Sequence, residues 1–270
     1  MIVRDMHEET YHSRPELSST QARLLLKSAA LFRYAMDHPR SPKRVFDVGS
    51  AAHTKILGEG SNVIEYPEEH LTPSGNVSTK GATLAWAEEK RAEGLIPVSP
   101  ADVADVNGMA EAVLAHPDSR PILERLTQRE VTIIQEIDGV PVRARFDLYG
   151  AGEAADLKSG RDASPSGFNR SIARYGYFVQ RRWYDDTNHA ETGDRLHAFP
   201  LIIVESTAPY LVGVYDLDFM YDERAGEKCR EARRRYRECT ETGIWPGYAR
   251  TTLTAPSWVI YEDADEEIQV

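Results

Sequence analysis

The chain has 270 residues, enough for one large domain, and its 41% hydrophobic and 28% charged residues are ordinary for a globular protein. It has no apolar run as long as a membrane span and no secretion-signal pattern at its start, so we expect a cytoplasmic protein without membrane contact. Its two cysteines are too few for a structural zinc site or an iron–sulfur cluster. The net charge of −11 argues mildly against nucleic acid, although an acidic protein can bind DNA where its positive groups gather.

The first half of the chain is predicted to be mainly helical. A helix runs from Thr20 to about Met36, with Ser18 or Ser19 as its N-cap, and the prolines that follow end it. The elements expected next are helices at about 45–57, 80–93 and 100–115, a short helix ending near residue 126, a strand at 62–66 and a polar loop at 67–82.

The second half is predicted to hold the β structure. Asp138-Gly139 separates two alternating runs, 129–137 and 140–149, which is a strong hairpin signal, and three residues separate the second run from a third at 153–158. Then follow a long helix at about 165–186, strands at 199–206 and 211–216, and an arginine-rich helix at 218–242. We expect one α/β domain over 1–255, with a mainly helical part at 10–126, a β core with flanking helices at 127–250, and an acidic tail at 256–270.

Two acids and a lysine are predicted to meet on neighbouring strands. Residues two apart on a strand project to the same side, so Asp156 and Lys158 share a face, and Asp147 shares one with Arg143 and Arg145. Carboxylates beside an ammonium group suit a hard divalent cation and a phosphodiester. An Asp-x-Lys pair on an exposed strand is usually only a solvated surface, so the hairpin alone leaves both interpretations open.

Residues elsewhere in the chain could join this group. His53 follows four small residues, which would let its helix approach a sheet closely, but a lone histidine is more often an ordinary surface or core group. Gln180 and Tyr184 share a helix face and could bind a phosphate or a base edge, or could belong to a half-buried helix. Glu130 is equally a further carboxylate of the site or an edge residue.

The order of these motifs resembles a known family. They are Gly-Ser-Ala-Ala-His at 49–53, Phe-Asp at 146–147, Ala-Asp-Leu-Lys-Ser at 155–159 and Val-Gln-x-x-x-Tyr at 179–184. Together they resemble the PD-(D/E)XK nuclease superfamily, in the branch of the RecB-type nuclease domains and exodeoxyribonuclease VIII (RecE), and the similarity to RecE covers roughly residues 10–250. The family often has proline where this chain has Phe146, but proline is not a ligand. Such proteins are common in phages, so a phage origin and a bacterial host cytoplasm are expected.

The resemblance implies a restriction-endonuclease-like α/β fold, in which helices flank a mixed central sheet. It implies that one or two Mg²⁺ or Mn²⁺ ions are held by His53, Asp147, Asp156 and the backbone carbonyl of Leu157. Lys158 would orient or deprotonate the attacking water or neutralise the phosphate, Gln180 and Tyr184 would position the strand, and Glu130 would be an auxiliary acid. We expect DNA to be contacted by Arg143, Arg145, Ser159, Arg161, Arg174 and Tyr177.

The activity implied is that of a metal-dependent exonuclease. Such an enzyme degrades one strand of duplex DNA from an end, as a ring-shaped homo-oligomer, and the single-strand tail feeds an annealing protein. A structure-specific or single-strand endonuclease on the same fold would carry the same motifs, so that alternative stays open. A non-catalytic DNA-binding or assembly protein is disfavoured, because the chain retains the whole set of His53, Asp147, Asp156 and Lys158.

Overall fold

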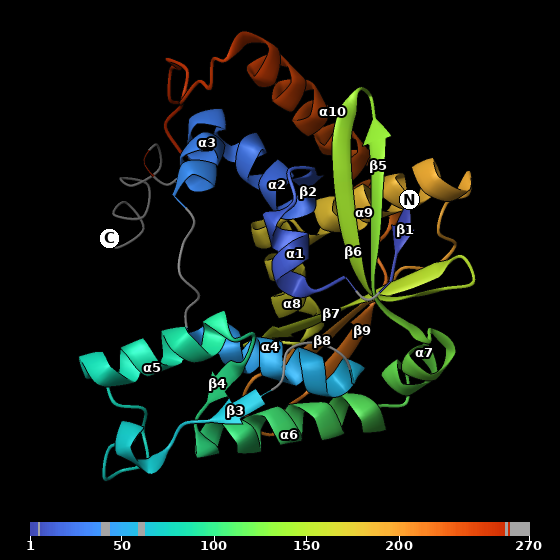
Figure 1. Cartoon of the computed structure of the whole chain (residues 1–270). Coiled ribbons are helices and arrows are strands. Elements are labelled where there is room, and N and C mark those ends of the chain that lie inside the picture. Colours follow the sequence, from blue (N-terminus) through green and yellow to red (C-terminus); the bar gives the residue numbers. More distant parts are fainter. Residues whose placement is uncertain (5, 39–43, 59–62, 257–258, 260–270) are drawn as a thin grey trace, which may run out of the picture.

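A mixed β-sheet flanked by helices forms the centre of the molecule (Figure 1). The computed structural model describes residues 1–4, 6–38, 44–58, 63–256 and 259. Within these ranges the sheet has seven strands, in the order β1-β5-β6-β7-β8-β9, with β2 paired to β6 outside this path. The strands are β1 (Ile2–Val3), β2 (Leu17–Ser18), β5 (Gln128–Ile137), β6 (Val140–Gly150), β7 (Glu153–Gly160), β8 (Leu201–Glu205) and β9 (Val212–Tyr215).

Ten helices lie in the described ranges; the first seven precede β5 in the sequence, two lie between β7 and β8, and the last follows β9. They are α1 (Glu8–Ser13), α2 (Ser19–Lys27), α3 (Ala29–Asp37), α4 (Arg44–Leu57), α5 (Gly81–Ala92), α6 (Pro100–Ala115), α7 (Ser119–Arg125), α8 (Pro165–Tyr175), α9 (Tyr177–Thr192) and α10 (Phe219–Thr242). A small parallel sheet, β3 (Val63–Glu65) with β4 (Ile96–Val98), and a 3₁₀ turn, Glu68–His70, lie between α4 and α6. None of the helices in the described ranges is long and apolar enough to cross a membrane.

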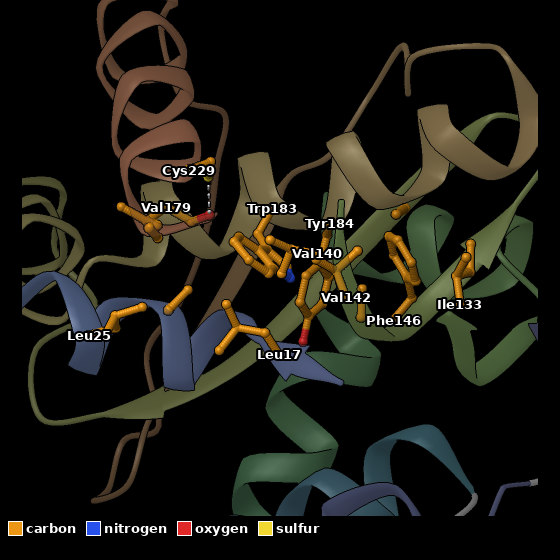
Figure 2. Close-up of a cluster of buried hydrophobic side chains, with 14 of the residues drawn as sticks. Leu17, Leu25, Ile133, Val140, Val142, Phe146, Val179, Trp183, Tyr184 and Cys229 are labelled. Atoms are coloured by element: carbon orange, nitrogen blue, oxygen red, sulfur yellow. Dashed lines mark hydrogen bonds between the residues drawn. The ribbon is translucent and has the colours of Figure 1, made fainter. Parts of the chain in front are cut away.

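Two main hydrophobic clusters join the helices to the sheet. The first packs α2, α9 and α10 against β5 and β6, and Figure 2 shows Trp183 among its buried side chains. Trp183 is 1% exposed and donates its indole N–H to the carbonyl of Arg143 at 3.2 Å. The second packs α4 and α6 against β7 and β8. The expected fold class, a mixed sheet flanked by helices, is confirmed. Because helices pack against β6 and β7 in both clusters, the polar side chains of these strands can reach solvent only where the helices leave the strands uncovered.

Two of the predicted helices are each split in two. The helix expected from Thr20 to Met36 is interrupted at Ser28, whose extended backbone (φ −169°, ψ 131°) ends α2 and whose hydroxyl accepts from the amide of Leu31 to cap α3. The helix expected at 165–186 is interrupted at Gly176, which has a left-handed backbone (φ 69°). Polar side chains and glycine can leave a helical path while the apolar periodicity continues, so the periodicity concealed both breaks.

The β predictions agree more closely with the structure. β5 pairs with β6 across the Asp138-Gly139 turn, and β6 pairs with β7 in a second antiparallel hairpin, as expected. The short strands β1, β2 and β4 were not predicted, because two or three residues give no periodicity, and neither was α1, whose six residues make less than two helical turns. The predicted acidic tail lies outside the described residues, except at Pro256 and Val259.

Candidate active site

The site begins where strands β6 and β7 separate. They pair antiparallel only near their turn, up to Leu148 opposite Ala155, and β7 then pairs in parallel with β8, starting at Asp156 opposite Leu201. Asp147 would be next in the β6–β7 register, and its Oδ2 instead accepts from the backbone amide of Leu157 at 2.7 Å. The carboxylate of Asp147 is therefore held in the fork between two strands.

Three potential ligands for a metal ion converge at this fork. His53 of α4 approaches Asp147 of β6 with 3.0 Å between Nε2 and Oδ2, and Glu130 of β5 with 3.4 Å between Nδ1 and Oε1. One ligand atom from each residue lies within 4.8 Å of the other two. An imidazole nitrogen and two carboxylates form a donor set that could hold a divalent cation, and oxygen-rich sets of this kind suit Mg²⁺ or Mn²⁺. The sequence left open whether Glu130 is a carboxylate of the site or an edge residue, and in the structure it belongs to this cluster.

Helix α4 reaches the fork because its sheet-facing residues are small. Ala51 is fully buried and Ala52 is 1% exposed, and a Cβ added at Gly49 would come within 3.1 Å of the hydroxyl of Ser159 on β7. A larger residue on this track would push the helix away from the strand. The small residues before His53 therefore set how close its imidazole comes to the carboxylates of Glu130 on β5 and Asp147 on β6.

Glu130 is held in place by its backbone and by an arginine. It lies opposite Asp147, between the pairs Arg129–Leu148 and Val131–Phe146, and has an unusual positive φ of 50° for a residue in a strand. Its second oxygen pairs with Arg145 Nε. Strained backbone of this type persists only where the surroundings impose it, and it concentrates at functional sites.

Asp156 and Lys158 lie beside the three-residue cluster. Asp156 is 1% exposed, its Oδ2 pairs with the ammonium of Lys158, and its Oδ1 accepts from the side-chain amide of Gln180 at 2.7 Å. The Lys158 Nζ also lies 5.1 Å from the centre of the Tyr177 ring. Asp156, expected as a ligand, thus adjoins the cluster without belonging to the three residues whose ligand atoms lie within reach of one another. Leu157, whose carbonyl was expected as a further ligand, meets Asp147 through its backbone amide.

Burial and neighbouring charges shift the acid–base behaviour of these groups. Burial raises the pKa of the Asp156 carboxyl to about 6, and Lys158 offsets only part of this effect. Burial alone would lower the pKa of His53, but the charges of Asp147 and Glu130 and the hydrogen bond with Asp147 raise it to about 9. His53 is therefore an imidazolium at neutral pH while the cluster holds no cation, and it must release a proton to become a ligand.

Lys158 and Asp147 are shifted in the directions that keep both charged. Burial opposes the charge on Lys158, but Asp156 and Asp147 outweigh it and raise the pKa of the ammonium. Burial likewise opposes the charge on Asp147, while His53 and Lys158 lower the pKa of that carboxyl. Lys158 therefore acts as a fixed positive charge at neutral pH.

Tyr184 and Arg143 are both largely buried. Tyr184 is 7% exposed, and its ring centre lies 4.9 Å from that of Phe146 (Figure 2). Arg143 is 2% exposed and donates to the backbone carbonyls of Arg14 and Glu16. The guanidinium of Arg143 thus anchors the N-terminal segment to β6, and the phenol of Tyr184 packs under the site.

One large cleft contains the cluster. Its volume is about 1660 Å³, and it is lined by the acid cluster, by Lys158, and by the exposed residues Ser159, Arg161 and Arg174. Tyr11 of α1 also lines it, with its ring 5.6 Å from the Arg145 guanidinium carbon. Sequence reasoning missed Tyr11 as a site residue, because α1 is too short to show a pattern.

Comparisons with known proteins place this chain in a family. A family model described as "PDDEXK-like domain of unknown function (DUF3799)" matches residues 18–252, and the chain belongs to that family. Among solved structures, a protein from Eubacterium rectale named "Putative exonuclease" is similar in fold, with a TM-score of 0.62 and 12% sequence identity over 97% of this chain and 99% of that one. No curated protein matches the sequence.

Proposed function

We propose that the protein is a metal-dependent deoxyribonuclease, and specifically an exonuclease that degrades one strand of duplex DNA from an end. The observation that carries this proposal is the grouping of His53, Glu130 and Asp147 beside the Asp156–Lys158 pair in one large cleft. Phosphodiester hydrolysis needs a cation to offset charge on phosphate oxygens and a positioned positive group nearby, and this site supplies residues for both.

The side chains divide these tasks between them. His53, Glu130 and Asp147 would hold Mg²⁺ or Mn²⁺, with Asp156 and the Leu157 carbonyl able to complete the shell, and the bound cation would lower the pKa of a water molecule. Lys158, whose raised pKa keeps it protonated at neutral pH, would stabilise the charged phosphate rather than remove a proton. Gln180 keeps Asp156 oriented through its hydrogen bond.

DNA is the proposed partner despite the net charge of −11, because Arg161 and Arg174 are exposed where they line the cleft. A ring-shaped homo-oligomer around its DNA product, a phage origin and delivery of the single-strand tail to an annealing protein are parts of the same proposal. Sizing of the purified protein tests the ring directly, and a monomer would count against it.

A digestion panel tests the function. DNA labelled at the 5′ or 3′ end, in linear, nicked, flapped and closed circular form, is incubated with Mg²⁺ or Mn²⁺. We expect loss of label from linear DNA and none from closed circles. We expect Lys158→Ala to abolish cleavage, whereas Lys90→Ala, which breaks ion pairs with Glu89 and Glu93 away from the cleft, leaves it unchanged. Cutting of flaps or circles would favour a structure-specific or single-strand endonuclease, and full turnover by folded Lys158→Ala would refute the site.

A further inference from the structure

The turn between α8 and α9 carries two tyrosines into the cleft. Tyr175 ends α8, Gly176 follows with φ 69°, and Tyr177 begins α9. Arg23 Nη1 donates to the carbonyl of Tyr175 at 2.6 Å, and a Cβ added at Gly176 would lie 3.0 Å from Arg23 Cδ. The conformation of this turn is therefore fixed by its own backbone and by α2, so the two rings have defined positions.

The two rings form a path that leads to Lys158. The Tyr177 ring lies against the Lys158 ammonium, with 5.1 Å from Nζ to its centre. The Tyr175 ring centre is 5.7 Å from that of Tyr177, at an interplanar angle of 36°, and Tyr175 is 52% exposed. Both residues line the cleft. The solvent-exposed ring of Tyr175 is thus separated only by the Tyr177 ring from Lys158, the lysine proposed to face the scissile phosphate.

Positive charge lies beside this aromatic surface. The Arg174 guanidinium carbon is 5.6 Å from the Tyr175 ring centre, and Arg161 is exposed in the same cleft with no hydrogen bond or ion pair to any residue of the described ranges. Arg170, one turn before Arg174 on α8, forms an ion pair at 3.5 Å with Asp162, which also lines the cleft. On a protein of net charge −11, such a grouping of cations and rings complements a chain of phosphates and bases.

We propose that Tyr175, continued by Tyr177, is a base-stacking platform for an unpaired stretch of the DNA strand that is cut. Bases within a duplex already have both faces stacked, so only a single-stranded or frayed nucleotide can offer a face to Tyr175. Stacking on an aromatic ring is insensitive to base identity, which suits an enzyme that degrades any sequence. This inference rests on the proposed function, because it needs the Lys158 end of the cleft to receive the phosphate.

The test measures binding of a single-stranded oligonucleotide that carries the fluorescent base 2-aminopurine, in EDTA so that no strand is cut. We expect Tyr175→Ala to weaken binding roughly 5- to 150-fold, the loss of one base stack, and to abolish the quenching of 2-aminopurine. Tyr175→Phe keeps the ring and should bind within about 2-fold of the wild type, since the stack does not need the hydroxyl. Tyr248→Ala removes a tyrosine that is 81% exposed and lies outside the cleft, and should change nothing.

The outcomes separate this inference from the proposed function. If the wild type binds the oligonucleotide and cuts linear DNA, but Tyr175→Ala binds as tightly and quenches as strongly, the stacking platform is refuted and the nuclease assignment stands. Equal loss in Tyr175→Phe and Tyr175→Ala would refute stacking in favour of a role for the hydroxyl. A wild type that neither binds nor cuts DNA would overturn the proposed function itself.

Discussion

Replacing Asp156 by asparagine should stabilise the metal-free protein while it removes activity. Asp156 is 1% exposed, and burial raises the pKa of its carboxyl to about 6 from a reference of 3.8. A shift of about two pKa units costs roughly 3 kcal/mol of folding free energy once the carboxyl is ionised. Asparagine keeps the shape and the oxygen that accepts from Gln180, but it carries no charge to bury.

The sign of the pH dependence follows from the raised pKa. The folded state binds a proton at Asp156 more tightly than the unfolded state does, so the wild type loses no stability from this carboxyl below about pH 3.8 and progressively more as the pH rises through about 6. Wild type and Asp156→Asn should therefore be similarly stable near pH 4, and the variant should be more stable by about 3 kcal/mol at pH 8.

Urea unfolding with a chelator present, at pH 4 and at pH 8, measures this difference. Asp194→Asn, at an exposed loop position, is the matched control and should show no gain at either pH. A variant less stable than the wild type at pH 8, or a difference that does not change with pH, would contradict the reasoning, because ionised Asp156 would then be stabilised rather than strained by its surroundings.

Two further changes test the fold around the site. Gly176→Ala should destabilise the folded protein by about 1–2 kcal/mol because of the positive φ, and by more because the added Cβ meets Arg23. Gly193→Ala, with φ 84° and open space around it, should show the backbone cost alone. Equal losses of stability in thermal denaturation would mean that Arg23 does not hold the α8–α9 turn. Asp186→Asn removes the carboxylate that pairs with the buried Arg233 and should cost about 3 kcal/mol at pH 7. Hydrogen bonds and charges from arginines outweigh burial and lower the pKa of Asp186. The stability difference between the wild type and Asp186→Asn should therefore shrink as the pH falls below 3.8. A difference in urea unfolding that stays constant with pH would count against this ion pair.

Local chemistry accounts for the parts of the molecule that the sequence predicts well. The Asp138-Gly139 turn needs two residues with positive φ, and both have it, at 54° and 72°, so the β5–β6 hairpin is encoded by adjacent residues. The two-residue alternation of a strand likewise puts Asp156 and Lys158 on one side, where their side chains pair. The small residues before His53 indicate the close approach of α4 without any knowledge of the sheet.

Long-range pairings account for what local patterns cannot predict. Arg143 shares the strand face of Asp147, but β2 pairs in parallel with β6 at Val142 and Arg143, and the N-terminal segment buries the guanidinium. Glu130 reaches His53 only because the β5–β6 register puts it opposite Asp147, and its left-handed backbone is a tertiary property. A sequence pattern can therefore indicate candidate residues for such a site, but the candidates that come into contact depend on how distant strands pair.

In the proposed function, His53, Glu130 and Asp147 bind the cation on which DNA cleavage depends. The most direct measurement is calorimetric titration of chelator-treated protein with Mn²⁺, followed by digestion of end-labelled linear duplex in the same samples. The wild type should bind Mn²⁺ with release of protons and recover cleavage, whereas Asp147→Asn, though folded, should lose both. Cleavage that persists in the chelator, or Mn²⁺ binding and turnover by Asp147→Asn equal to the wild type, would contradict the account.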